Sequence, residues 1–222
     1  MALPLPAALL GLSLAIGLPT FGSYRRRTRA APPDWAALRS GVLRYWGLFL
    51  LIVTLGLLAG GPADLGLSLP SIGTLIDGVL IGYIAFGGTM LLVGLVLRYA
   101  DTYTTSEAAR VAFDQPLSRR LWIASTNAVV EPIVYLGFVL EAVVGLGGPR
   151  WLAGVIGATG LLLVRAQWSP RNALQWLPGS VILAGIAVVT RSVVPIVLIR
   201  FLYDGIVLVV ANAEEPGGES SE

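Results

Sequence analysis

The feature that most constrains this chain is the length of its apolar stretches. The hydrocarbon core of a bilayer is about 30 Å thick, so a helix of roughly 20 predominantly apolar residues can cross it. The chain has 222 residues, of which 55% are hydrophobic and only 13% are charged. These runs predict an all-α integral membrane protein, a polytopic bundle of transmembrane helices.

We expect a single transmembrane domain over residues 1–212. Its seven spans are predicted at residues 3–18, 45–60, 72–97, 117–144, 151–164, 176–189 and 193–210. Arginines follow the first apolar stretch and do not precede it. This order favours a membrane helix, with a cleaved signal peptide as the alternative. Residues 213–222 form an acidic tail that is expected to be disordered.

The arginine distribution predicts the orientation, because cytoplasmic loops are enriched in basic residues. With seven spans, Arg150 and Arg191 lie in the outer connections, and Arg200 lies within a span. The predicted inner connections hold Arg25, Arg26, Arg27, Arg29, Arg39, Arg44, Arg98, Arg110, Arg119, Arg120, Arg165 and Arg171. We therefore expect a multi-pass protein of the cell membrane with its N-terminus outside and its C-terminus in the cytoplasm. The absence of lysine among the basic residues indicates a GC-rich or halophilic prokaryotic genome.

Composition and motifs also restrict function. There is no cysteine and no histidine, so a disulfide framework, a thiolate metal site and the commonest general base are missing. No glycine-rich phosphate loop and no basic and aromatic stripe is present, so nucleic acid is not an expected partner. The expected surroundings are the lipid bilayer.

Few ionisable side chains fall at membrane depth. Glu131, Arg200 and Asp204 do so, and Gln167 lies at a membrane edge. An Arg or Asp at a helix centre costs roughly 2.5–3.5 kcal/mol on insertion, so such residues usually mark a site. Arg200 and Asp204 are four residues apart and share one helix face. We predict a buried cluster of Glu131, Arg200 and Asp204, beside a helix disturbed by Pro132.

The sequence around Glu131 resembles a known motif. Residues 131–138 read EPIVYLGF, which is similar to a degraded Glu-Glu-x-x-x-Arg-Gly signature of the CAAX protease and bacteriocin-processing (CPBP) family of intramembrane metalloproteases. Glu131 keeps the first position of that signature. Pro132 replaces the second Glu, and Leu136 replaces the Arg. The resemblance implies a CAAX-protease-like core in the second half of the chain.

Two further segments resemble the other motifs of this family, in the same order. Leu163 and Gln167 stand where the family has Phe-x-x-x-His, and Arg200 and Asp204 stand where it has His followed by Asn or Asp. The resemblance implies metal-assisted hydrolysis, with a Glu as general base and His residues that bind metal or stabilise the oxyanion. Gln167 offers only a weak carbonyl ligand, and Arg200 is a permanent cation that cannot bind a metal.

We therefore expect no functional catalytic residue, no metal and no cofactor. The favoured interpretation is a pseudoprotease that binds or scaffolds another membrane protein or a lipidated peptide. Three alternatives remain. Glu131 and Arg200 can serve only as a packing pair between helices. The chain can be an active membrane endopeptidase that works without metal, with Glu131 or Asp204 as acid or base. It can also be a small-molecule transporter, which would need a continuous polar path.

Overall fold

The computed structural model describes residues 4–27, 34–59, 61–100, 107–166 and 169–210, and every element in them is helical. In chain order the elements are α1 (Leu5–Leu12), the π-helix η1 (Ser13–Gly17), α2 (Leu18–Arg27), α3 (Trp35–Ala59), the 3₁₀-helix η2 (Pro62–Leu65), α4 (Ile72–Tyr99), α5 (Glu107–Phe113), α6 (Leu117–Glu131), the π-helix η3 (Pro132–Phe138), α7 (Val139–Gly145), α8 (Arg150–Ala166), α9 (Pro170–Thr190) and α10 (Val194–Val210).

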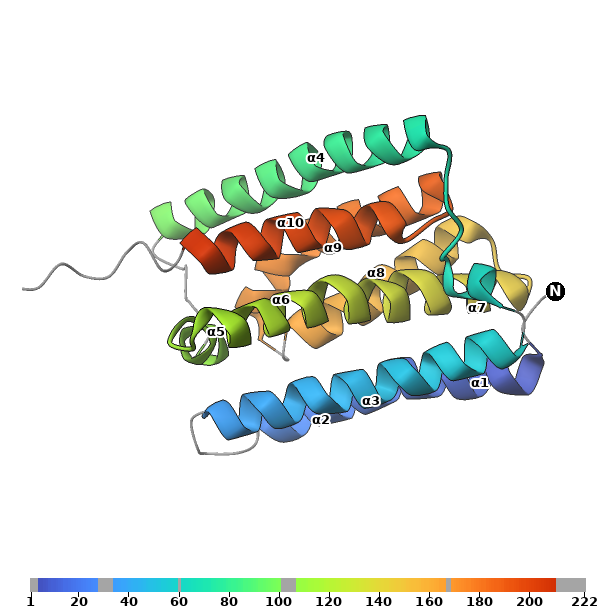
Figure 1. Ribbon diagram of the computed structural model, residues 1–222, viewed down its shortest axis with the longest axis horizontal. Helices are drawn as coiled ribbons and strands as arrows, with labels where there is room; N and C mark the ends of the chain where they lie inside the picture. Colours follow the sequence, from blue (N-terminus) through green and yellow to red (C-terminus); the bar gives the residue numbers. More distant parts are fainter. Residues whose placement is uncertain (1–3, 28–33, 60, 101–106, 167–168, 211–222) are drawn as a thin grey trace, which may run out of the picture.

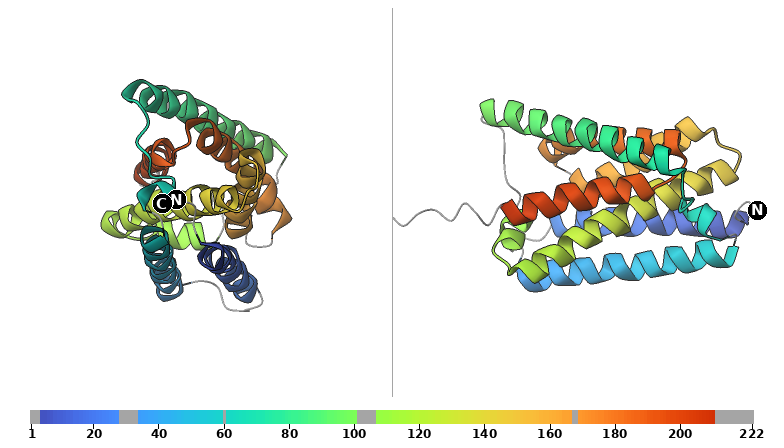
Figure 2. Two further views of the ribbon diagram at one scale, coloured as in Figure 1. Left: turned by 90° about the vertical axis from the view of Figure 1, so that its right-hand side faces the viewer. Right: turned by 45° about the horizontal axis from the view of Figure 1, so that its top comes forward.

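A continuous helical segment made of α6, η3 and α7 forms the centre of the bundle, and we term it the central rod. It lies between the α1–α3 hairpin on one side and α4, α9 and α10 on the other (Figure 1), an arrangement that the turned views retain (Figure 2). In its most apolar window 72% of residues are buried, against 17% for α4. The rod is therefore enclosed by protein, whereas α4 lies at the outside.

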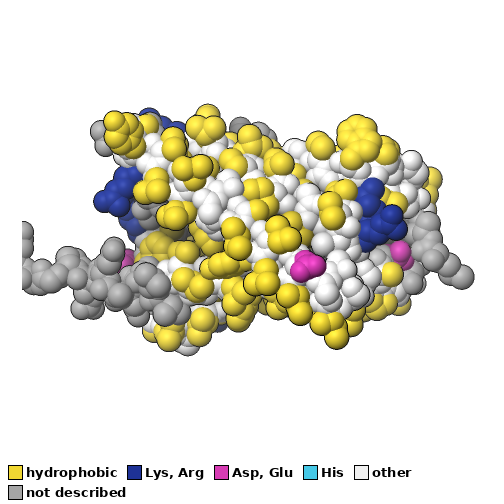
Figure 3. Space-filling view, turned by 90° about the horizontal axis from the view of Figure 1, so that it is seen from above, with side chains coloured by type: hydrophobic (Ala, Val, Ile, Leu, Met, Phe, Trp, Pro, Cys, Tyr) yellow, Lys and Arg dark blue, Asp and Glu magenta, His cyan; other side chains and the backbone are white. Residues whose placement is uncertain are grey.

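Five helices of the described residues are long and apolar enough to cross a membrane. They are Leu5–Gly22, Trp35–Leu58, Ile72–Tyr99, Leu117–Gly145 and Pro170–Thr190. The helices α8 and α10 have 17 residues each in the described part. The chain is thus an all-helical, multi-pass membrane-type protein. Its outer face over α4 is covered largely by hydrophobic side chains (Figure 3), as expected for a surface that meets lipid.

Several predicted boundaries were wrong. The first helical segment continues to Arg27, beyond the predicted end at residue 18, and passes through Pro19 and Gly22 without a break. Arg165 was placed in an inner connection, but it belongs to the last turn of α8. The next helix begins at Pro170, where Pro suits the first turn and the Ser169 side chain caps the N–H of Asn172.

Pro132 changes the hydrogen-bond pattern of the central rod. Proline has no N–H and its ring crowds the preceding turn, so an ordinary α-helix cannot continue unchanged through it. Here seven residues, Pro132–Phe138, adopt π-helical geometry before α-helix resumes at Val139. The predicted disturbance therefore takes the form of a π-helix inside a continuous rod, a feature that often occurs at functional sites.

Glycines set the closest approaches between helices. A Cβ on Gly82 of α4 would lie 2.6 Å from Ile199 Cδ1 of α10, so the absence of a side chain there lets Ile199 pack directly against α4. At the end of the bundle that carries η2, the loop after η2 binds the α9–α10 turn. The Val193 N–H donates to the Gly66 carbonyl at 2.9 Å, and the Ser192 hydroxyl donates to the Ser68 carbonyl. These bonds fix the position where α10 begins.

Candidate functional site

The last residue of α6, Glu131, lies at the centre of a buried group of charges. Its Oε2 atom accepts a hydrogen bond from Arg165 Nε at 2.8 Å and another from Arg165 Nη2. Arg200 Nη2 lies 3.7 Å from the same oxygen. One carboxylate oxygen of the central rod is therefore shared by two guanidinium groups, one from α8 and one from α10.

Arg200 and Asp204 complete this group through the local pairing expected one helical turn apart. Arg200 Nη2 lies 2.8 Å from Asp204 Oδ2, and their side chains are 3% and 10% exposed. Neither atom has the angles of a hydrogen bond to any described residue, so the contact is an ion pair. We term Glu131, Arg165, Arg200 and Asp204 the charge cluster; it holds two cations and two anions and is formally neutral.

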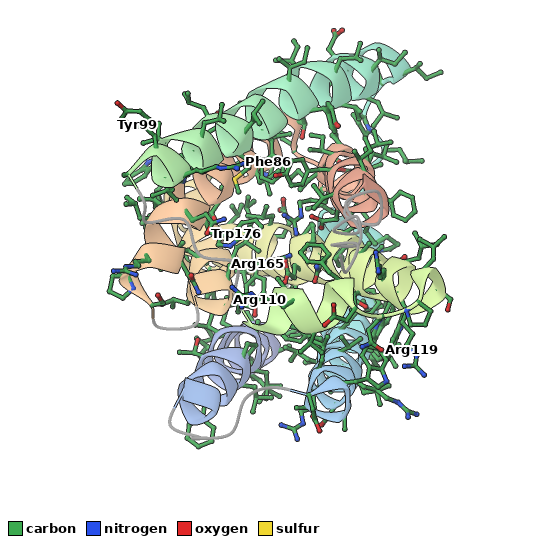
Figure 4. All side chains as sticks on the ribbon, turned by 90° about the vertical axis from the view of Figure 1, so that its left-hand side faces the viewer. Phe86, Tyr99, Arg110, Arg119, Arg165 and Trp176 are labelled. Atoms are coloured by element: carbon green, nitrogen blue, oxygen red, sulfur yellow. The ribbon has the colours of Figure 1, made fainter. Side chains whose placement is uncertain are left out.

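Aromatic rings cover both guanidinium groups. The Arg165 Cζ atom lies 4.7 Å from the centre of the Trp176 ring, and Arg200 Cζ lies 5.6 Å from it. Phe86 of α4 lies 5.7 Å from Arg200 Cζ and packs edge-to-face against Tyr203. The end-on view shows Arg165 beside Trp176 in the bundle interior, with Phe86 on the α4 side (Figure 4). Cation–π contacts of this kind replace part of the lost hydration of a buried Arg.

Glycines on α8 explain why Arg165 reaches Glu131. A Cβ on Gly157 would lie 2.6 Å from the Tyr135 carbonyl oxygen, and one on Gly160 would lie 2.8 Å from the Tyr135 ring. The helix α8 can therefore pack directly against η3. Arg165 lies eight residues after Gly157, close to two helical turns further along the same face, which brings its side chain level with the end of α6.

Two buried hydroxyl groups near this part of the bundle have no hydrogen-bond partner among the described residues. They are Tyr135 OH on η3 and Ser180 Oγ on α9, whose residues are 1% and 2% exposed. A buried hydroxyl without a partner costs free energy, and it is usually satisfied by water or by a ligand. The interior therefore contains hydroxyl groups, in addition to the charge cluster, that can still form hydrogen bonds.

The structure places the predicted site residues as follows. Glu131, Arg200 and Asp204 lie together and are buried. Pro132 and Leu136 lie next to them along the rod in η3, and both are buried. Gln167 lies outside the described residues. Sequence reasoning missed Arg165 and Trp176, since both had been assigned to helix ends. The available signal was spacing, because Gly157, Leu161 and Arg165 repeat every four residues on one face.

The chemistry of this site is dominated by fixed ion pairs. Arg cannot lose its proton or bind a cation, and both carboxylates that face the cluster already contact guanidinium groups. Within the described ranges, no three Asp, Glu, His or Cys side chains converge as a metal site requires. The absence of a metal and of a cofactor stays a prediction. What the arrangement can do is bind polar groups beside an aromatic surface in the bundle interior.

Comparison with protein-family models, with curated proteins and with solved structures finds no match to this chain. The resemblance to CPBP proteases therefore depends on the residues of its three motifs alone.

Proposed function

We propose that this chain is a CPBP-like membrane protein in which ion pairs have replaced the catalytic centre, so that it binds a membrane partner without cleaving it. The partner is another membrane protein or a lipidated peptide. One observation carries the proposal. The Glu131 carboxylate, at the first position of the protease-like motif, is shared by the Arg165 and Arg200 guanidinium groups.

A hydrolase of this kind needs a carboxylate that is free to take a proton from water. Here the Glu131 side chain is 7% exposed and engaged by two cations. Asp204 is engaged by Arg200 in the same way. This arrangement supports a binding role over a metal-independent endopeptidase. It also argues against a transporter, which would need a continuous polar path, since the buried ion pairs of the described residues lie at one level, beside Glu131 at the middle of the central rod.

We propose that the chain crosses the membrane seven times. The spans are the five helices that are long enough to cross a membrane, together with α8 and α10. Residues 117–210 form a CAAX-protease-like core in this topology. In this arrangement the N-terminus lies outside the cell and the C-terminus in the cytoplasm. The bias of arginines toward the connections on the cytoplasmic side supports this orientation.

The test uses the full-length protein in liposomes with a farnesylated peptide that carries a benzophenone group. We expect light-dependent crosslinking to the protein, and recovery of the unbound peptide intact by mass spectrometry. The same peptide without its farnesyl group should crosslink at background level. These three readouts separate binding from cleavage.

One result would overturn the proposal, and a second would exclude lipidated peptides as the partner. Cleavage that is lost in Glu131→Gln but retained in Glu141→Gln would identify an active endopeptidase, because both residues lie on the central rod and only Glu131 belongs to the charge cluster. Equal crosslinking of the farnesylated and plain peptides would show that lipidated peptides are not bound. Scaffolding of a membrane protein would then need to appear as a stoichiometric complex after solubilisation in mild detergent.

A further inference from the structure

The first turns of α3 carry a hollow that is separate from the charge cluster. It has a volume of about 500 Å³ and is lined by Trp35, Ala36, Arg39, Ser40, Leu43 and Arg44. These residues form two neighbouring rows at four-residue spacing, and such rows are the ridges of a helix surface. The groove between the ridges is an open one, and Ala36 and Ser40 contribute short side chains to it.

The side of α3 next to the groove packs against the bundle, and Trp35 belongs to both. Val42 packs with Ala112 of α5 and Ile123 of α6 in a small apolar cluster. The Trp35 ring lies edge-to-face with Trp122, at 6.3 Å between centres, and the Arg119 guanidinium lies 4.8 Å from it. The groove is therefore flanked on one side by helices that pack against α3.

Among the described residues, the two cations of the groove have no counter-charge. Arg39 and Arg44 are exposed, and no described residue forms an ion pair or hydrogen bond with either of them. The acid at the start of this helix, Asp34, is engaged in capping, because its Oδ1 accepts from the Ala37 N–H at 2.7 Å. The groove thus offers two free guanidinium groups and a hydroxyl.

The position of the groove along α3 matches the level of lipid headgroups. With 25 residues, α3 is about 37 Å long at 1.5 Å per residue, which exceeds the roughly 30 Å hydrocarbon core. At least one of its ends therefore extends beyond that core, and the positions of Arg39 and Arg44 place its beginning at the headgroup level. Further along, Gly47 has open space where a side chain would be, and the exposed Leu50 and Leu51 follow. An apolar path continues from the groove into the membrane.

We propose that this groove binds one anionic phospholipid. Its phosphate lies between Arg39 and Arg44, the Ser40 hydroxyl donates to a phosphate oxygen, and an acyl chain runs over Gly47. The combination of unpaired cations above and an apolar path below fits an amphiphile with a negative headgroup, and a free phosphate ion would leave the apolar path unused. This site depends neither on the family assignment nor on the charge cluster.

The test is native mass spectrometry of the full-length protein released from detergent, with phosphatidylglycerol or phosphatidylcholine of identical acyl chains added. Basic residues near a membrane contribute enough attraction to anionic lipid that we expect a roughly tenfold preference for phosphatidylglycerol. Arg39→Gln with Arg44→Gln should lower its adducts to the phosphatidylcholine level. The control, Arg98→Gln with Arg171→Gln, removes the same charge from exposed positions outside the groove and should keep the preference.

Three outcomes would overturn the proposal. The first is equal binding of the two lipids. The second is equal loss of phosphatidylglycerol in the control variant, which would indicate diffuse attraction to a basic surface. The third is an adduct of glycerol phosphate at the same concentration, which would identify a soluble anion as the ligand. As a separate check on the acyl path, Gly47→Leu should weaken phosphatidylglycerol adducts while both arginines remain.

Discussion

The central rod carries two carboxylates ten residues apart, Glu131 and Glu141, and each is paired with an arginine of α8. Their surroundings differ. Glu141 makes a two-pronged contact with Arg150 at 2.9 and 3.3 Å, with side chains 18% and 27% exposed. Glu131 is 7% exposed and is joined by a second guanidinium and an aromatic ring.

The presence of an ion pair does not by itself determine how much a charged residue contributes to the free energy of unfolding. A partly exposed ion pair gains little, because water already stabilises both partners. A buried pair gains little over apolar residues of the same shape, but losing one member leaves an uncompensated charge and costs far more. Glu141 and Arg150 therefore fix a turn, whereas the charge cluster joins three helices, α6, α8 and α10.

The largest expected effect comes from removing the shared cation of the cluster. Arg200→Ala should lower the free energy of unfolding by about 3–5 kcal/mol, because Asp204 loses its counter-charge in a buried site. The measurement is unfolding in dodecyl maltoside micelles with increasing SDS, followed by circular dichroism. Arg171→Ala, at an exposed position, should change stability by less than about 0.5 kcal/mol. Equal losses in the two variants would show that the cluster is hydrated.

A second prediction concerns the packing that brings α8 to the rod. Gly157→Ala should cost about 1–3 kcal/mol, because its Cβ would lie 2.6 Å from the Tyr135 carbonyl and push the helices apart. Gly185→Ala on α9 is the control, since nothing lies within 4 Å of its Cβ position. The same unfolding assay compares them. If Gly157→Ala matches its control, close approach of α8 is not what positions Arg165.

A third prediction tests the aromatic side of the comparison. Trp176→Leu should destabilise the protein by roughly 1–2 kcal/mol, because both Arg165 and Arg200 lose the ring that replaces part of their hydration. Trp151→Leu provides the control, as Trp151 is 65% exposed. Thermal unfolding of the two variants in the same detergent gives the comparison. A larger loss in Trp151→Leu would contradict a role for Trp176 in the cluster.

The smallest effect is expected at the partly exposed pair. Glu141→Gln should lower the free energy of unfolding by at most about 1 kcal/mol, since Arg150 remains in contact with water. Glu131→Gln, measured beside it, should cost several times more. Similar values for the two variants would remove the distinction between the regions and indicate that both carboxylates are equally hydrated.

The sequence predicted the parts of the site that depend on local geometry. Arg200 and Asp204 are one helical turn apart, so their proximity follows from the helix alone. The boundaries that were wrong, at Arg27 and around Arg165, lie where polar residues continue a helix beyond its apolar run.

By itself the sequence determined that this is a helical membrane protein, because apolar runs of this length can satisfy their backbone groups in lipid only as helices. The tertiary structure decided which charges meet. That Arg165 and not Arg200 makes the close hydrogen bonds to Glu131 depends on the rotation of α8 and on its contact with η3 through Gly157. These are relations between helices far apart in the chain, which no local periodicity specifies.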